Sequence, residues 1–229
     1  MMKLYSEHNT SELFEFRTPT IIAAFTENSI MKTTPLRKII EENMGDRPFK
    51  RKLSIASSDL NKGQVIYFDE TMANDERVDA ILSSAAISFA FPPVNMRDMT
   101  LVDGSLFSTV SVGDPIERCR EEVTRDEDII IDVILCYEDT YEIEDWSLPE
   151  TRWRTALDFY RRRKEINKYY YYEEDIMRIT RGYHNINFRL LIKPGIPLTS
   201  NGFLPINATH EEIMNEIGQG YLDGLNATD

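Results

Sequence analysis

Apolar and polar positions along this chain predict short strands separated by helices. The clearest strand signal is IIIDVILC at 129–136, a nearly continuous apolar run that is typical of a central parallel strand covered on both faces. Residues 186–193, INFRLLIK, predict a second strand. A long charged stretch at about 150–181 predicts a helix between them, and residues 209–225 predict a closing helix.

The first half of the chain predicts shorter elements. Pro35 suits the first turn of an amphipathic helix that stops near Gly45. Two strands at 52–58 and 64–69, joined by a turn at 61–63 that contains a glycine, predict a hairpin.

A second group of elements surrounds an Asp-Gly dipeptide. Asn74 can cap a helix that runs to about Ser84. The double proline at 92–93 breaks regular structure, and MTLVDG after it predicts a short strand that ends in a tight turn at Asp103–Gly104. A further helix is expected at about 114–123, with a proline in its first turn.

Strands that alternate with helices at short spacing predict an α/β fold. Residues 1–17 are a polar lead-in, and TPTIIAAF at 18–25 begins the folded part as a buried strand or a turn of helix. A length of 229 residues favours one domain, or one domain with appendages. The helices are too few to cover both faces of a complete parallel sheet, so half a sheet is expected.

Composition narrows the classes of partner. The hydrophobic share of 41% and charged share of 28% are those of an ordinary soluble globular protein. A net charge of −13 argues against nucleic acid and against anionic membrane surfaces, because both would be repelled. Neutral or zwitterionic lipids stay open as partners.

The sequence leaves the compartment open. No apolar run approaches the ~20 residues of a transmembrane helix, and the start, MMKLYSEHNT, lacks the apolar core of a signal peptide. The protein is then soluble or peripheral at a membrane, or secreted if a signal lies upstream of Met1. Three glycosylation sequons matter only in the secreted case: Asn9, Asn207 and Asn226.

Neither metal nor cofactor is expected. Cys119 and Cys136 are interpreted as two buried reduced thiols, with a single disulfide as the alternative. The acidic run at 138–146 lacks the glycine-centred loop of a calcium site and indicates a solvated loop. The basic and tyrosine-rich stretch at 161–175 indicates salt bridges and half-buried tyrosines on a helix, not nucleic-acid binding.

Four stretches stand out by their order and spacing along the chain: TTPLRKII at 33–40, KLSIASSDLNKGQVIYF at 52–68, DAILSSAAISFAFPPV at 79–94 and LVDGSLFSTVSVGDPIERC at 101–119. Together they resemble the C-terminal half of the patatin-like phospholipase (lipid acyl hydrolase) family. The resemblance covers residues 18–140 well and 186–225 loosely. It implies a partial three-layer α/β/α domain with a central, mostly parallel sheet, of which residues 18–229 would be the C-terminal portion.

The resemblance also implies a chemistry. In that family a Ser–Asp dyad hydrolyses acyl esters of phospholipids or neutral lipids: the serine of a G-x-S-x-G elbow attacks, and the aspartate of a D-G-G or D-G-A motif is the general base. Asp103 and Gly104 match the first two positions of that motif. Ser105 departs from it, and a glycine would be required there if the loop needed a positive φ. An ordinary Asp-Gly turn is the structural alternative.

The nucleophile is missing from these 229 residues. They contain no G-x-S-x-G and no glycine-rich oxyanion loop, and the nearest approach, TVSVG at 109–113, lacks the first glycine and follows the aspartate. Ser105, Ser108 and Ser111 are therefore rejected as nucleophiles. The histidines give no triad and are interpreted as polar surface residues: His8, His184 and His210.

Three hypotheses follow. The chain is the C-terminal part of an active serine lipid hydrolase whose nucleophile is encoded upstream. Alternatively, it is a catalytically dead remnant that serves as a lipid-binding or protein-interaction module. The third hypothesis is an unrelated α/β binding domain in which Asp103 faces no cleft.

Overall fold

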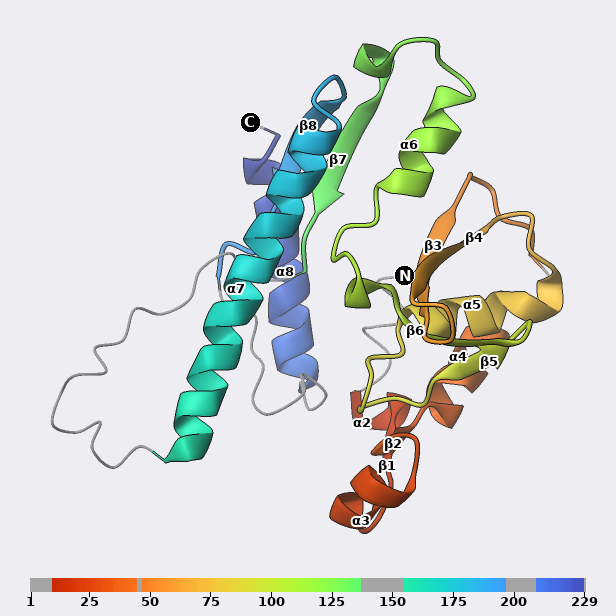
Figure 1. The fold of residues 1–229 in the computed structure, drawn as a ribbon, viewed down its shortest axis with the longest axis vertical. Helices are drawn as coiled ribbons and strands as arrows, with labels where there is room; N and C mark the ends of the chain where they lie inside the picture. Colours follow the sequence, from red (N-terminus) through yellow and green to blue (C-terminus); the bar gives the residue numbers. More distant parts are fainter. Residues whose placement is uncertain (1–9, 45–46, 137–154, 197–208, 229) are drawn as a thin grey trace, which may run out of the picture. The chain divides into compact units, whose positions relative to one another are not determined.

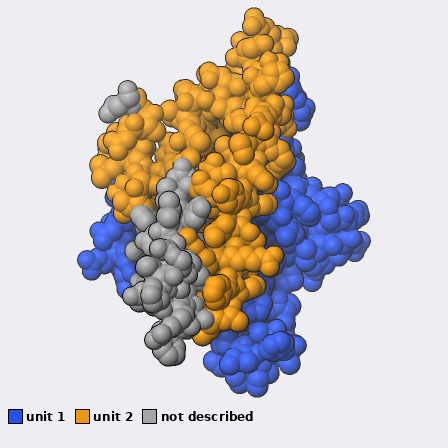
Figure 2. All heavy atoms as spheres, turned by 60° about the vertical axis from the view of Figure 1, so that its left-hand side comes forward, with its two compact units in different colours: residues 1–122, 199–218 blue, residues 123–198, 219–229 orange. Residues whose placement is uncertain are grey.

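A computed structural model of the chain describes residues 10–44, 47–136, 155–196 and 209–228. The chain divides into two compact units (Figure 2). Unit 1 comprises residues 1–122 and 199–218, and unit 2 comprises residues 123–198 and 219–229. Both contain helices and strands, which confirms the mixed α/β class.

Unit 1 is built on a four-stranded sheet in the order β4-β3-β6-β5 (Figure 1). Its strands are β3 Ser54–Asp59, β4 Gln64–Asp69, β5 Val94–Met96 and β6 Met99–Asp103. The predicted hairpin is confirmed, since β3 and β4 pair antiparallel from Ser54 opposite Asp69 to Asp59 opposite Gln64.

Every pair of neighbours in this sheet is antiparallel, so a central, mostly parallel sheet is not confirmed. For the pairs β3–β4 and β5–β6 the physical reason is the length of the connections. Four residues, 60–63, join β3 to β4, and Gly63 there has φ +65°. Arg97 and Asp98, with φ 51° and 61°, join β5 to β6 in a two-residue turn. Parallel neighbours would need crossovers of a dozen residues or more.

One helix, α5 Arg77–Ser84, packs against β3, β5 and β6. The core between them contains Ile55, Phe68, Met72, Ala80, Met96 and Leu101. Other elements of unit 1 are α2 Thr10–Leu13, β1 Glu15–Phe16, α3 Thr20–Thr26, β2 Met31–Lys32, α4 Thr34–Met44, the 3₁₀ turn η1 Asn74–Glu76, α5 Arg77–Ser84, the 3₁₀ turn η2 Gly104–Leu106 and α6 Gly113–Arg120. The apolar run at 18–25 is thus mostly the short helix α3 rather than a strand.

Unit 2 contains a parallel strand pair joined by a helix. Its elements are the 3₁₀ turn η3 Asp126–Asp128, β7 Ile130–Ile134, α7 Ala156–Gly182 and β8 Asn187–Ile192. Thr155 and Asp158 form a capping box that starts α7. The parallel pairing of β7 agrees with the sequence, but its coverage does not, because Ile130 is 53% and Ile134 76% exposed. A last helix, α8 His210–Asn226, contributes residues to both units.

The structure tests the predicted burial of the cysteines and of the tyrosine run. Both thiols are free, but the prediction that they are buried is wrong, since Cys119 is half-buried and Cys136 is exposed. Tyr169 and Tyr172 are half-buried as predicted, whereas Tyr170 and Tyr171 are exposed. Other features lie outside the described residues: His8, Asn9, the acidic run 138–146, residues 150–154 of the predicted helix, and Asn207.

Candidate active site

Asp103 is the last residue of β6, at the point where the strand passes into the η2 turn. Leu101 and Val102 directly before it are 0% and 3% exposed, and they anchor the strand in the sheet. The side chain of Asp103 itself is half-exposed. A carboxylate at such a strand end is held by rigid backbone while it stays accessible to a reacting group.

Two hydrogen bonds orient Asp103. Its backbone amide donates to the carbonyl oxygen of Ala86 at 3.0 Å, and its Oδ1 accepts a hydrogen bond from the backbone amide of Ser105 at 2.7 Å. The second bond makes Asp103 the N-cap of η2. Within the described ranges the carboxylate forms no ion pair, and Oδ2 accepts no hydrogen bond. One oxygen is therefore fixed, and the other keeps its lone pairs for a further donor.

Gly104 is required at its position by close packing. A Cβ atom there would lie 2.6 Å from the carbonyl oxygen of Ala56, far inside contact distance. The φ of Gly104 is not in the left-handed region. The second position of the motif thus brings the turn against β3, which a larger residue would prevent.

Ser105 occupies its position without backbone strain. It lies in η2, and the described non-glycine residues with positive φ are Phe89, Arg97 and Asp98. A glycine is needed only where φ is positive. The departure from the usual D-G-G or D-G-A pattern therefore leaves the turn geometry intact, because the turn uses the amide of residue 105 rather than its side chain.

Three neighbouring serines differ in their surroundings. Ser108 donates its hydroxyl to the carbonyl of Val110 at 3.0 Å, and Ser111 lies just before α6. Ser57 lies directly opposite Asp103 across β3 and β6, but it is 0% exposed. A fully buried hydroxyl cannot reach a lipid carbonyl.

An ion pair anchors the helix that follows the Asp103 loop. Arg118 of α6 donates to the carbonyl of Leu53 and pairs with Glu70, which also accepts from the amide of Leu53 at 2.9 Å. The hydrogen bond from Arg118 holds the pKa of Glu70 at about 2, well below its ordinary 4.5, and the Leu53 amide adds to the effect. The far end of the loop is thereby tied to the start of β3 and the end of β4.

The described histidines lie on other elements than Asp103. His184 lies between α7 and β8, and His210 is the first residue of α8. No group of three or more His, Cys, Asp and Glu side chains in the described part of the chain is arranged to hold a metal ion.

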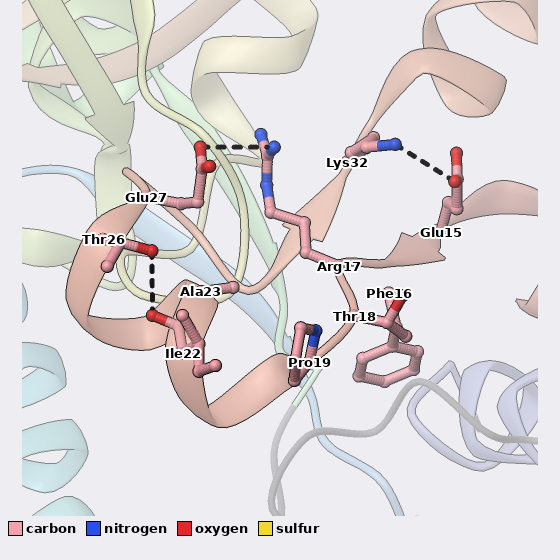
Figure 3. A pocket seen from close by; sticks show the side chains of 10 residues that line it. All are labelled: Glu15, Phe16, Arg17, Thr18, Pro19, Ile22, Ala23, Thr26, Glu27 and Lys32. Carbon is pink, nitrogen blue, oxygen red and sulfur yellow. Dashed lines mark hydrogen bonds and ion pairs between the residues drawn. The ribbon is translucent and has the colours of Figure 1, made fainter.

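Unit 1 also contains a pocket of about 270 Å³ around α3, which Asp103 does not line (Figure 3). Lys32 pairs with Glu15 at 3.1 Å, and Arg17 pairs with Glu27 at 3.5 Å, so the charges at its rim compensate each other. It is lined by Glu15, Phe16, Arg17, Thr18, Pro19, Ile22, Ala23, Thr26, Glu27 and Lys32. No motif marks this pocket in the sequence, because its lining comes from the single segment 15–32.

Next to this pocket, α3 exposes apolar side chains. Ile21 is 79% exposed, Ile22 56% and Phe25 87%. Over the residues that the structure describes, no helix is both long and apolar enough to cross a membrane.

Comparison with known proteins identifies the region around Asp103. Residues 3–116 match the family model described as patatin-like phospholipase. No curated protein matches the chain significantly. The matched region contains the whole four-stranded sheet, Asp103 and Gly104, whereas the loosely similar stretch 186–225 lies beyond it. Residues 3–116 of this chain therefore belong to the patatin-like phospholipase family.

Proposed function

We propose that Asp103 is the general base of a Ser–Asp dyad in the hydrolysis of lipid acyl esters, and that this chain is the C-terminal part of such an enzyme. The observation that supports the proposal most directly is the state of the carboxylate. It stands at a strand end, half-exposed, with Oδ1 held by the Ser105 amide and without an ion pair among the described residues. Family membership of residues 3–116 supplies the class of reaction and of substrate.

In the proposed chemistry the two carboxylate oxygens of Asp103 have different roles. A serine hydroxyl gives its proton to Asp103 as Oγ attacks the ester carbonyl, and that proton then passes to the departing alcohol. Water hydrolyses the acyl-enzyme, with the carboxylate again accepting and returning a proton. The Ser105 amide would keep Oδ1 oriented, so that Oδ2 takes the proton.

This sequence contains no G-x-S-x-G and no glycine-rich loop, so the proposal places the serine and the oxyanion donors outside residues 1–229. The protein of 229 residues should then have no esterase turnover, because it lacks both the covalent step and the main electrostatic stabilisation of the transition state.

A fluorophosphonate probe, which labels reactive serines, tests whether the nucleophile lies outside residues 1–229. The 229-residue protein should stay unlabelled, and a longer protein that carries an upstream G-x-S-x-G should be labelled. In the longer protein, Asp103→Asn should lower kcat by about 10²–10⁴-fold, which is the contribution of a positioned acid–base group. Labelling of the 229-residue protein would contradict the rejection of its own serines, and an active Asp103→Asn enzyme would refute the dyad.

The alternative is a catalytically dead remnant that binds lipid or protein. The lack of a nucleophile in this sequence favours it, whereas the unstrained Ser105 removes one argument for it. A stop codon close upstream of Met1, together with lipid binding by the 229-residue protein, would support this alternative. An in-frame glycine-rich loop followed by G-x-S-x-G would support the hydrolase.

We further propose that α3 makes a peripheral contact with a zwitterionic or neutral lipid surface. Three large apolar side chains on one short helix are exposed: Ile21, Ile22 and Phe25. Their transfer out of water is favourable by about 1.5–3 kcal/mol each. The net charge of −13 opposes an anionic surface, so uncharged or zwitterionic headgroups fit best.

A further inference from the structure

Two buried serines form a hydroxyl pair between the sheet and α5, close to the backbone of Asp103. Ser57 of β3 and Ser83 of α5 are both 0% exposed, and their Oγ atoms lie 2.7 Å apart. Ser83 also donates to the carbonyl oxygen of Ala80 at 2.8 Å. A hydroxyl has one proton, so Ser83 uses its proton on Ala80, and Ser57 is the donor within the pair.

The serine pair is connected to Asp103 by two routes, one through strand pairing and one through backbone hydrogen bonds. Ser57 lies directly opposite Asp103 in the pairing of β3 with β6. Ser83 continues into the turn after α5, where the amide of Ala86 donates to the carbonyl of Ser83 at 3.2 Å. The carbonyl of Ala86 in turn accepts the amide of Asp103 at 3.0 Å. Asp103 is thus connected to Ser57 both across the sheet and through the end of α5.

Stability alone does not account for these two hydroxyls. Burying a hydroxyl costs free energy that its hydrogen bond only offsets, and two apolar residues of the same shape would be nearly neutral or stabilising. Ala80 and Leu101, which belong to the core between α5 and the sheet, are apolar and fully buried. A directional bond does what apolar packing cannot, because it sets the rotation of the last turn of α5 against β3.

We propose that Ser57 and Ser83 are positioning residues for Asp103: their hydrogen bond fixes the end of α5, the carbonyl of Ala86 then holds the Asp103 amide, and the carboxylate is aimed as a consequence. The inference rests on the proposed role of Asp103 as base. It adds two residues that touch neither substrate nor the reacting atoms.

Nuclear magnetic resonance of the 229-residue protein tests the proposal without any measurement of hydrolysis. Two signals report on Asp103: the exchange rate of its amide proton, and the chemical shift of the Ser105 amide proton, which forms a hydrogen bond to the Asp103 carboxylate. In Ser83→Ala the hydroxyl of Ser57 loses its acceptor. The Asp103 amide should then exchange on the order of tenfold faster, and the chemical shift of the Ser105 amide proton should change as its hydrogen bond to Asp103 weakens.

Ser29→Ala is the matched control. Ser29 is 3% exposed and donates to the carbonyl of Met31 at 2.7 Å, so its loss removes an equally buried hydrogen bond elsewhere in unit 1. A merely structural role predicts the same general loss of stability in both variants. The positioning role predicts that the signals of Asp103 and Ser105 change in Ser83→Ala alone.

Ser57→Ala covers the case in which Ser83→Ala does not fold, because Ser83 keeps its bond to Ala80 and the loss is milder. In the unmodified protein, the amides of Ala86 and Asp103 should also show equal protection, since one opening of the turn releases both. The proposal is overturned if Ser57→Ala and Ser83→Ala affect Asp103 and Ser105 no more than Ser29→Ala does. That result would not affect the proposed Ser–Asp dyad. The dyad itself would be refuted only if the longer protein stayed active with Asp103→Asn.

Discussion

A Cβ atom on residue 104 would lie 2.6 Å from the carbonyl oxygen of Ala56, so Gly104 and Ala56 bring the turn after Asp103 into direct contact with β3. The obstacle is backbone, which cannot turn away as the end of a flexible side chain can. The glycine of the Asp-Gly motif is thus explained by space rather than by dihedral freedom.

Gly104→Ala should destabilise unit 1 by about 1–3 kcal/mol, the range for overpacking a tight interior site. The measurement is thermal unfolding followed by circular dichroism. Gly220→Ala in α8 is the control, because a Cβ there meets nothing within 4 Å. It should be neutral or stabilising by about 0.4–1 kcal/mol. Equal midpoints for the two variants would show that the turn can move away from β3.

Ser105→Gly should not stabilise the protein, although glycine is the usual residue at this position of the motif. The φ of Ser105 is not left-handed, so a glycine relieves no strain and only adds freedom to the unfolded chain. We expect a loss of about 0.4–1 kcal/mol in urea unfolding. A gain in stability would mean that the serine is strained after all.

Acid should weaken unit 1 through Glu70. Arg118 holds the pKa of Glu70 at about 2 in the folded state, against 4.5 ordinarily. Because the folded pKa lies below the unfolded one, the stabilisation is complete above pH 4.5 and is lost as the pH falls toward about 2. Glu70→Gln should lower stability at neutral pH and flatten the decline within that window.

Urea midpoints measured across the acid range test the Glu70 prediction. Glu174→Gln, at an exposed position of α7, is the control and should leave the acid decline as it is in the unmodified protein. If Glu70→Gln and the unmodified protein lost stability in parallel through the whole range, the pair with Arg118 would contribute nothing.

Vesicle binding should depend on α3. Ile21→Ser combined with Phe25→Ser removes the two most exposed apolar side chains of the helix. Binding to phosphatidylcholine vesicles should weaken on the order of tenfold or more for each residue, from the apolar transfer energy. Sedimentation with vesicles measures it, and anionic vesicles should bind the unmodified protein less.

Ile134→Ser is the matched control for α3, since Ile134 is 76% exposed but lies on β7 of unit 2. It should leave vesicle binding unchanged. If it weakened binding as much as the α3 variant does, general surface hydrophobicity would be responsible, and α3 would have no special role.

Local sequence patterns predicted the elements that local physics controls. The hairpin of β3 and β4, the helices α4 and α5, and the strand that ends at Asp103 all follow from turn residues and periodicity within a few positions. The predicted cap of α5 is wrong, because Asn74 starts η1 and no side chain caps α5. The short strands β1, β2 and β5 were all missed. Of these, β5 belongs to the four-stranded sheet. Its turn uses Arg97 and Asp98 at positive φ, where Asn-Gly or Asp-Gly would have been recognised.

Pairing partners were predicted less well, because they depend on residues far apart in the chain. The apolar run at β7 indicated a covered central strand, yet Ile130 and Ile134 are exposed and its partner in the described sheet is β8 alone. At the site, the motif pointed to Asp103 and Gly104. The pair of Ser57 with Ser83 could not be found, since 26 residues separate them and neither carries a motif of its own.

By itself, the sequence determined the family resemblance, the candidate base and the absence of a G-x-S-x-G serine, because a motif is a set of neighbouring residues whose order is fixed by the chain. Only the tertiary structure decided how that base is held: which oxygen of Asp103 is occupied, why residue 104 has no side chain, and which buried hydroxyls meet between β3 and α5. Those answers depend on distances between segments that folding brings together, and a sequence records no such distances.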